Sequence, residues 1–421
     1  MQEWTWKVIT ALTLGWCGSA TAQTSTFDRI KIFPVTPIAD LLGITPGSDG
    51  ALWFTIYNAY EIGRITTAGQ ITEYSLPHPP NDPYGIAAGP DGALWFTESS
   101  LYGYAGIGRI TTGGMITEYP TPTQNSYPVG ITAGPDGAMW FAEEDGNAIG
   151  RINMAGDITE YPLPGPNANT AEITTGPDGA LWFPMPAVNA IGRITTSGVL
   201  TQFPLPLVAS YPYAIATGPD GALWFTELDS NSVGRMTTSG SETEYPLPTA
   251  RGYAEGITPG PDGALWLAEF FGDKVARITT TGEITEYPIT TPGGLSAITT
   301  GPDGNLWFTA YNDEYDPTPA AEIGRAPACA LGFNASFASG TLTMNFDMGI
   351  NTAASFDIHF HSSSGVSMPY SRQISALAAP YAFSMLWPGI PDLGELTVEP
   401  VLTSGTGEPI CAAQTVVNTA P

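Results

Sequence analysis

Short runs of apolar residues, separated by turn residues, follow one another at regular intervals along most of this chain. The stretch GIAAGPDGALWFTESSLYGYAGIGRITTGGMITEYPTP contains four such runs, at residues 85–89, 93–97, 107–111 and 115–119. Pro-Asp-Gly and Gly-Gly between the runs are typical of tight turns. Apolar residues do not recur with the 3.6-residue period of a helix. The pattern therefore predicts a unit of four short antiparallel strands.

This unit recurs seven times, and a Trp marks each copy. A fixed period near 42 residues with four strands per copy is typical of a β-propeller. The marker residues are Trp53, Trp95, Trp140, Trp182, Trp224, Trp266 and Trp307. The sequence thus predicts an all-β chain that contains a seven-bladed β-propeller.

The last copy ends early, which bears on how the ring closes. It supplies only three runs, the third at residues 321–326, whereas FDRIKIFPV at residues 27–35 aligns with the fourth run of the other copies. We therefore expect the N-terminal strand to complete the seventh blade and to remove an open sheet edge.

Residues that repeat in every copy are interpreted as the frame of the propeller. The repeated Trp and Phe should pack between blades, each contributing roughly 1.5–3 kcal/mol when buried. Seven Arg also repeat, and we expect each to pair either with the Asp of the tight turn or with a Glu of the fourth strand. Two of these Arg are Arg109 and Arg151.

The composition changes after Arg325. Short alternating runs such as TLTMNFDM and SFDIHFH, separated by Ser and Gly, predict a small β-sandwich. Cys329 and Cys411 lie near its two ends and are expected to form one disulfide. The predicted organisation is a signal peptide at 1–22, the propeller at 23–326 and the C-terminal module at 327–421.

Charge and the N-terminus limit the possible partners. The chain has 40 acidic and 13 basic residues, a net charge of −27, which argues against a nucleic-acid partner. Lys7, the apolar run 8–16 and Ala20-Thr21-Ala22 resemble a secretory signal, so we expect a secreted, periplasmic or cell-surface protein. Lipidation at Cys17 is the alternative to cleavage. No apolar run is long enough to span a membrane, and we expect a monomer.

The phrases GPDGALWFTE, IGRITT and ITEYPLP at this period resemble the streptogramin lyases, also called virginiamycin B lyases, over residues 27–325. The resemblance implies a seven-bladed propeller that opens a cyclic depsipeptide by elimination with Mg²⁺. It also implies a general-base His in a PHGIT or PHAIT phrase, and metal-binding carboxylates that include the Glu closing a WF-x-E phrase.

The chain departs from the family at the implied base. None of the positions that match the His is His; they are Leu42, Tyr84, Val129, Ala171, Tyr213, Glu255 and Ser296. The Glu of the WF-x-E phrase is present as Glu98, Glu143, Glu227 and Glu269. Glu255 is a candidate replacement base, on the condition that burial raises its pKa.

Loops at the mouth of the central channel are rich in Tyr, Asp, Glu and Asn. We expect ligand binding by Tyr84, Tyr213, Glu98, Glu143 and Glu227, and a site for Mg²⁺ or Ca²⁺ at Glu255 and Glu269. The alternative is that acidic loops simply follow from an acidic composition.

The sequence after residue 22 contains three His residues. His78, in a proline-rich loop, is expected to be solvated. In FDIHFHS, Asp357, His359 and His361 share one face of a strand. Two His at this spacing can bind one metal ion, but an ordinary half-buried strand shows the same alternation.

Three functional hypotheses follow. In the preferred one, an exported lyase-like propeller binds a small molecule, peptide or glycan at its acidic, aromatic mouth. The alternatives are an active Mg²⁺-dependent carbon–oxygen lyase with Glu255 as base, and a structural or adhesive surface protein.

Overall fold

The computed structural model describes residues 30–35, 39–99, 104–165, 167–207, 209–289, 293–311 and 321–327, and the backbone of eight strands between Gly332 and Asn418. The chain contains two compact units, with Arg29–Ala326 in one and Pro327–Pro421 in the other. No helix within the described ranges is long and apolar enough to cross a membrane. The predicted signal peptide 1–22 lies outside the described residues, as does Cys329 of the predicted Cys329–Cys411 disulfide.

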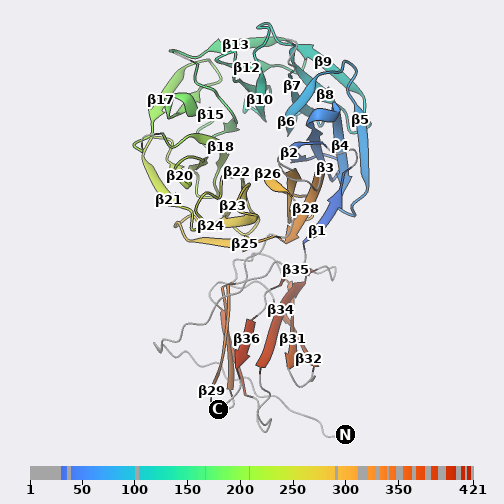
Figure 1. The fold of residues 1–421 in the computed structure, drawn as a ribbon, viewed down its shortest axis with the longest axis vertical. Helices are drawn as coiled ribbons and strands as arrows, with labels where there is room; N and C mark the ends of the chain where they lie inside the picture. Colours follow the sequence, from blue (N-terminus) through green and yellow to red (C-terminus); the bar gives the residue numbers. More distant parts are fainter. Residues whose placement is uncertain are drawn as a thin grey trace. The chain divides into compact units, whose positions relative to one another are not determined.

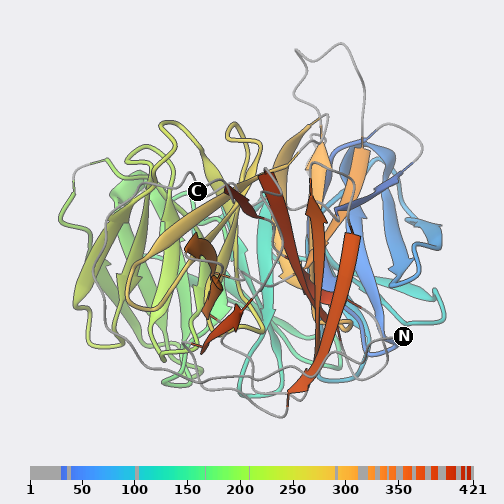
Figure 2. The ribbon, with the colours of Figure 1, turned by 90° about the horizontal axis from the view of Figure 1, so that it is seen from below.

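The unit Arg29–Ala326 is a seven-bladed β-propeller, as predicted. Seven four-stranded antiparallel sheets surround a common axis (Figure 1), and Figure 2 shows the same sheets from the side. Each of blades 1 to 6 uses four consecutive strands, the first innermost and the fourth outermost. Two single 3₁₀ turns, η1 (Tyr57–Ala59) and η2 (Pro186–Val188), follow the second strands of blades 1 and 4.

The strand bounds are as follows: blade 1, β2 (Leu41–Pro46), β3 (Ala51–Ile56), β4 (Glu61–Thr66) and β5 (Ile71–Ser75); blade 2, β6 (Asp82–Ala88), β7 (Leu94–Ser99), β8 (Ala105–Ile110) and β9 (Ile116–Pro120); blade 3, β10 (Pro128–Ala133), β11 (Met139–Glu143), β12 (Ala148–Ile152) and β13 (Ile158–Pro162); blade 4, β14 (Thr174–Thr175), β15 (Leu181–Met185), β16 (Ala190–Ile194) and β17 (Leu200–Pro204); blade 5, β18 (Pro212–Thr217), β19 (Leu223–Glu227), β20 (Ser232–Met236) and β21 (Glu242–Pro246); blade 6, β22 (Ala254–Pro259), β23 (Leu265–Glu269), β24 (Lys274–Ile278) and β25 (Ile284–Pro288); blade 7, β26 (Gly294–Thr300), β27 (Asn305–Tyr311), β28 (Ala321–Pro327) and β1 (Lys31–Pro34).

The chain's own N-terminal strand closes the ring. β1 pairs antiparallel with β28, with Lys31 opposite Arg325 and Pro34 opposite Glu322. The seventh sheet therefore has the order β1-β28-β27-β26, and the two ends of the repeat are joined by hydrogen bonds. The predicted closure is confirmed.

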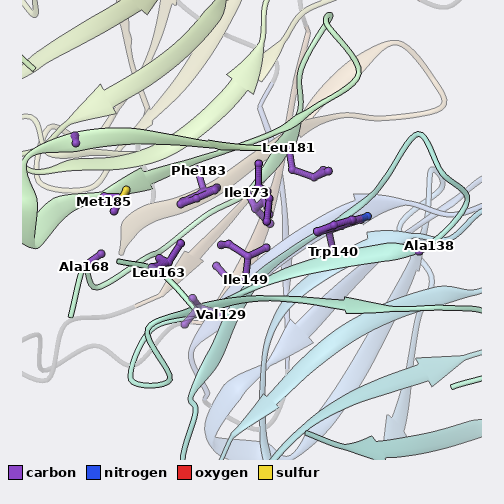
Figure 3. Packing of buried hydrophobic residues seen from close by; sticks show 13 residues of the cluster. Val129, Ala138, Trp140, Ile149, Leu163, Ala168, Ile173, Leu181, Phe183 and Met185 are labelled. Atoms are coloured by element: carbon purple, nitrogen blue, oxygen red, sulfur yellow. The ribbon is translucent and has the colours of Figure 1, made fainter. Parts of the chain in front are cut away.

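The repeated Trp residues pack between blades, as expected. Figure 3 shows Trp140 of blade 3 in one cluster with Leu181 and Phe183 of blade 4. In the same way, Trp307 of blade 7 packs against Leu52 and other residues of blade 1. The packing between blades therefore continues from the last blade to the first. All seven Trp side chains are fully buried. Apolar packing between neighbours thus holds the blades in a ring.

Each repeated Arg binds the Asp of the tight turn, so the structure decides between the two expected partners. In blade 3, Arg151 Nε donates to Asp136 Oδ2 at 2.7 Å, and Trp140 Nε1 donates to Asp136 Oδ1 at 3.0 Å. The Arg151 guanidinium also lies over the Trp140 ring, 5.9 Å from its centroid. One Asp side chain therefore fixes the Trp, the Arg and the turn together.

A second pair of positions varies in concert between blades. In blade 3, Phe141 lies directly opposite Gly150, and a Cβ at Gly150 would lie only 2.0 Å from Phe141 Cζ. Blade 6 instead has Leu267 opposite Ala276. Blade 6 therefore has a smaller side chain (Leu for Phe) where its partner has one more methyl group (Ala for Gly). This exchange indicates that the two side chains fill one shared volume.

Buried Thr residues join neighbouring innermost strands around the channel. Thr97 Oγ1 accepts a hydrogen bond from Gly85 N at 2.9 Å and donates one to Val129 O of the next blade at 2.6 Å. Where blade 3 has Ala142 at the equivalent place, Gly130 N reaches Ala171 O directly at 3.0 Å. The backbone groups of the channel wall are therefore satisfied in either way.

The C-terminal unit contains two antiparallel sheets. One has the order β29 (Gly332–Ala338), β30 (Thr341–Asp347) and β33 (Tyr381–Leu386). The other has the order β32 (Ser367–Ile374), β31 (Ala354–Ser362), β34 (Glu395–Thr403) and β35 (Pro409–Ala412), and β36 (Thr415–Asn418) also pairs with β34.

Candidate functional site

A cavity of ≈ 150 Å³ lies where the innermost strands converge on the propeller axis. Residues from every blade line it, because each innermost strand presents its first residues to the axis. The polar side chains in its wall are Tyr84, Glu172, Tyr213, Glu255 and Ser296. The volume suits one ring or side chain, since pockets for whole ligands usually measure about 300–1,000 Å³.

Two Tyr residues meet across this cavity. Tyr84 from β6 of blade 2 and Tyr213 from β18 of blade 5 approach with their hydroxyl oxygens 3.1 Å apart, a hydrogen-bond distance. Burial raises the pKa of Tyr84 well above its ordinary value. Repulsion from Tyr84, followed by burial, does the same to the pKa of Tyr213. Both phenols are therefore neutral near pH 7 and can donate hydrogen bonds to a ligand.

Two carboxyl groups flank the Tyr pair. Burial raises the pKa of Glu255, in β22, to about 7, and the hydroxyl of Ser296 partly opposes the shift by bonding the carboxylate. Burial likewise raises the pKa of Glu172 to about 7, opposed by the backbone N–H of Ile173. Groups that titrate near neutrality can accept or release a proton under ordinary conditions. Burial thus raises the pKa of Glu255, as a role as replacement base would require.

Glu172 also lines the cavity, although the sequence analysis does not predict it as a site residue. It occupies the place of the Gly in the repeated G-I-T phrase, one residue after the position that matches the family His. Its Oε2 would lie 2.8 Å from a Cβ at Gly130, so the neighbouring blade accommodates the carboxyl by having no side chain there. In the sequence, the replacement of this Gly by Glu in one copy of the repeat is the signal that could have identified Glu172.

Aromatic residues continue from the cavity to the rim of the channel. Tyr57 stands edge-on to Tyr84, with ring centroids 6.2 Å apart, and its hydroxyl lies 3.3 Å from that of Tyr127. On the side of blades 5 and 6, Tyr253 packs edge-on against Phe271, and Phe271 is 58% exposed. This rim offers aromatic faces to the rest of a ligand whose tip enters the cavity.

The backbone at the rim adopts the left-handed conformation at matching places. Tyr127, Tyr211 and Tyr253, each two residues before a position that matches the family His, have φ of 49°, 54° and 52°. This conformation is costly for a bulky residue, about 1–2 kcal/mol, and occurs more often at binding sites.

Glu98, Glu143 and Glu227, predicted to bind ligand, do not line the cavity. Glu143 and Glu227 are the last residues of the second strands β11 and β19, and Glu98 is the last but one of β7. Their side chains are buried, with exposed fractions of 0% for Glu98 and Glu143 and 2% for Glu227. Burial, with repulsion from Glu118 of the same blade, raises the pKa of Glu98 to about 8. Burial also raises the pKa of Glu143 to about 8. Each thus lies over its own blade and not at the axis.

Glu255 and Glu269, the two carboxyl groups predicted to share a metal ion, lie on neighbouring strands, where Glu269 is opposite Ala254, the residue before Glu255. Glu255 lines the cavity, whereas the charged neighbours of Glu269 are Glu286 and Lys274. Within the described part of the chain, no three His, Cys, Asp or Glu side chains lie close enough to hold a metal ion.

His78 lies away from the cavity. Its side chain is 76% exposed, and Nδ1 bonds the carboxylate of Glu118. No imidazole is among the residues that line the cavity.

Comparison with known proteins places this architecture in a family. The model of the virginiamycin B lyase family matches residues 15–217 and 158–315, which together cover well over half of the chain. The chain belongs to the virginiamycin B lyase family. Its C-terminal unit lies beyond the matched residues. No curated protein matches the chain.

Solved structures agree with the family assignment. A streptogramin B lyase is 36% identical, with a TM-score of 0.65, over 71% of this chain and 97% of its own. A catalytically inactive His-to-Ala variant of virginiamycin B lyase from Staphylococcus aureus, with quinupristin, is 40% identical with the same TM-score, over 71% of this chain and 98% of its own. Among the described residues, this family member thus carries Tyr and Glu, and no His, around the cavity at its axis.

Proposed function

We propose that this member of the virginiamycin B lyase family binds a small molecule, peptide or glycan at its channel mouth and does not carry out a His-dependent elimination. The observation that supports this is the cavity wall, which has two Tyr, two Glu and one Ser but no His. In the similar S. aureus enzyme, replacement of one His by Ala gives a catalytically inactive protein.

The cavity is small, so we propose that it takes one polar group of the ligand while the aromatic rim holds the rest. The wall contains carboxyl and hydroxyl groups and no Lys or Arg. Hydrogen-bond donors and positive charge on the ligand would therefore be favoured, and anionic groups would be repelled.

Titration calorimetry with quinupristin tests this proposal. Tyr84→Phe and Tyr213→Phe remove the two hydroxyl groups and should each weaken binding by roughly tenfold, about 1–1.5 kcal/mol for a buried hydrogen bond. Tyr161→Phe is the matched control, because Tyr161 stacks on Trp140 inside blade 3. Equal effects in all three variants, or no binding by the wild-type protein, would contradict a site at the axis.

The second candidate is elimination with the carboxylate of Glu255 as base. The observation in its favour is the pKa of Glu255, raised to about 7 in the cavity. Its signature would be a ring-opened product with a new carbon–carbon double bond, formed by the wild-type protein and lost in Glu255→Gln. A third possibility, a purely structural or adhesive protein, would show neither binding nor product.

We further propose that the protein is exported as a monomer with its C-terminal module folded as a β-sandwich closed by Cys329–Cys411. The signal-like sequence at 1–22 and the two antiparallel sheets support this. N-terminal sequencing of exported protein, together with its mass before and after reduction, tests cleavage and the disulfide.

A further inference from the structure

The five-stranded sheet of the C-terminal unit brings two His and one Glu to neighbouring positions. β31 is hydrogen-bonded to β32 on one side and to β34 on the other (Figure 1). The register places His359 directly opposite Glu399 of β34 and His361 opposite Thr397. The sequence alone, with Asp357, His359 and His361 on one strand, did not reveal Glu399 as their neighbour.

The register also separates a polar face from an apolar one. Phe356, Ile358 and Phe360 of β31 share a face, and their partners on β34 are Leu402, Pro400 and Val398. His359, His361 and Glu399 share the opposite face, since side chains alternate along a strand. On β32, the partners of His361 and Asp357 on that face are Ser367 and Ser371. One face thus carries mainly apolar residues, with Arg372 of β32 opposite Phe356, and the other carries the two His, Glu399 and Asp357.

Backbone spacing places the three residues within reach of a common ion. His359 and His361 are two residues apart, about 6.6 Å along a strand. His359 and Glu399 are direct antiparallel partners, with Cα atoms about 4.5–5.5 Å apart, and His361 and Glu399 are diagonal neighbours at about 7–8 Å. Two imidazoles and one carboxylate from such positions form the donor set of open transition-metal sites.

We infer that His359, His361 and Glu399 form a binding site for a divalent transition-metal ion, with Zn²⁺ as the ion expected under ordinary conditions. Imidazole nitrogen favours Zn²⁺ and its transition-metal neighbours, whereas Mg²⁺ and Ca²⁺ prefer oxygen ligands alone. The site belongs to the C-terminal unit and lies beyond the residues that match the family.

The competing explanation is a cross-strand ion pair between Glu399 and a protonated His359, which needs no metal. The two explanations differ in stoichiometry and in their dependence on His361. A metal site binds one ion per chain and requires His361, whereas an ion pair binds none. Asp357 shares the face but lies opposite Val401, on the far side of His359 from His361, so it serves as an internal control.

Equilibrium dialysis of the full-length protein against Zn²⁺, after treatment with a chelator, tests the inference. We expect one Zn²⁺ per chain, and a loss of affinity of about tenfold or more in each of His359→Ala, His361→Ala and Glu399→Gln, because even outer-shell changes cost 10–100-fold. Asp357→Asn and His78→Ala should bind as the wild-type protein does. Far-UV circular dichroism of each variant verifies that it is folded.

Three results would overturn the inference: no stoichiometric Zn²⁺ binding by the wild-type protein, binding lost in His78→Ala, or an equal loss in Asp357→Asn. If a His variant fails to fold, thermal unfolding of the wild-type protein with and without Zn²⁺ decides the matter. A bound ion raises the midpoint because it stabilises the folded state, by an amount that grows with the logarithm of the free ion concentration over Kd, and an unchanged midpoint at saturating Zn²⁺ contradicts the site.

Discussion

Adding one methyl group at Gly150 is expected to destabilise blade 3, and a smaller residue at Phe141 is expected to reverse most of that loss. The new Cβ would lie 2.0 Å from Phe141 Cζ, whereas carbon atoms in contact are about 3.5 Å apart. Both residues lie in fully paired strands, so the ring cannot simply swing away. Overpacking of this kind costs about 1–3 kcal/mol. Gly150 has no positive φ, so the cost is steric and not conformational.

The compensating change copies the pair found in blade 6. Phe141→Leu alone removes part of a buried ring and should cost about 1–2 kcal/mol. In the double variant the methyl group fills the space that the ring leaves, as Ala276 does beside Leu267. The two changes should therefore cost less together than the sum of the single changes, with a coupling of about 1–3 kcal/mol.

Guanidinium unfolding followed by Trp fluorescence measures the four proteins of this cycle, since all seven repeated Trp are buried in the propeller. The reverse exchange in blade 6, Leu267→Phe with Ala276→Gly, is the matched control and should show the same coupling. Additive costs in both blades would refute the idea that the two positions share one volume.

Three further predictions concern the frame of the propeller. Thr97→Val removes the hydroxyl that links blades 2 and 3 and should lower the free energy of unfolding by about 2–4 kcal/mol in the same assay. Thr97→Ala should cost less, because Gly85 N and Val129 O can then bond directly. Equal costs for the two variants would contradict this. Folding raises the pKa of Glu143 from about 4.5 to about 8, so its contribution to stability is present below pH 4.5 and is lost as the pH rises through 8. Glu143→Gln should therefore gain up to about 4 kcal/mol relative to wild type between pH 5 and 9, and a parallel pH profile would contradict the shift. Turn carboxylates such as Asp136 have lowered pKa values, so their contribution to the stability of the folded state is lost below about pH 4. Unfolding at a series of pH values should therefore show a stability maximum between about pH 4 and 6. A maximum above pH 8 would contradict this prediction.

The propeller was predictable because its defining features repeat along the chain. Period, strand number and the missing fourth strand of the last copy are all visible in order, and pairing of β1 with β28 follows from them. The partner of Arg151 was not predictable, since Asp136 and the Glu of the fourth strand both lie within its reach along the repeat. The structure favours Asp136, because one carboxylate there binds Arg151 and Trp140 together.

The cavity was only partly predictable, because it depends on residues that meet across the ring. The sequence predicts Tyr84 and Tyr213 as separate ligand-binding residues. Their contact joins blades 2 and 5, and no local sequence pattern connects these two blades. Glu98 was assigned to the mouth from its family motif. Strand alternation, however, puts Glu98 on the same face as Phe96, over the small residues Gly106 and Gly108, and so on the blade and not at the axis.

The central claim, binding at the axis without His-dependent elimination, is tested most directly by incubating the wild-type protein with quinupristin and Mg²⁺. Elimination opens the ring without changing its mass, so the products must be separated by chromatography and identified by fragmentation. The account predicts that quinupristin is recovered intact from a stoichiometric complex. A ring-opened product with a new double bond, accumulating beyond one turnover per protein, would contradict it.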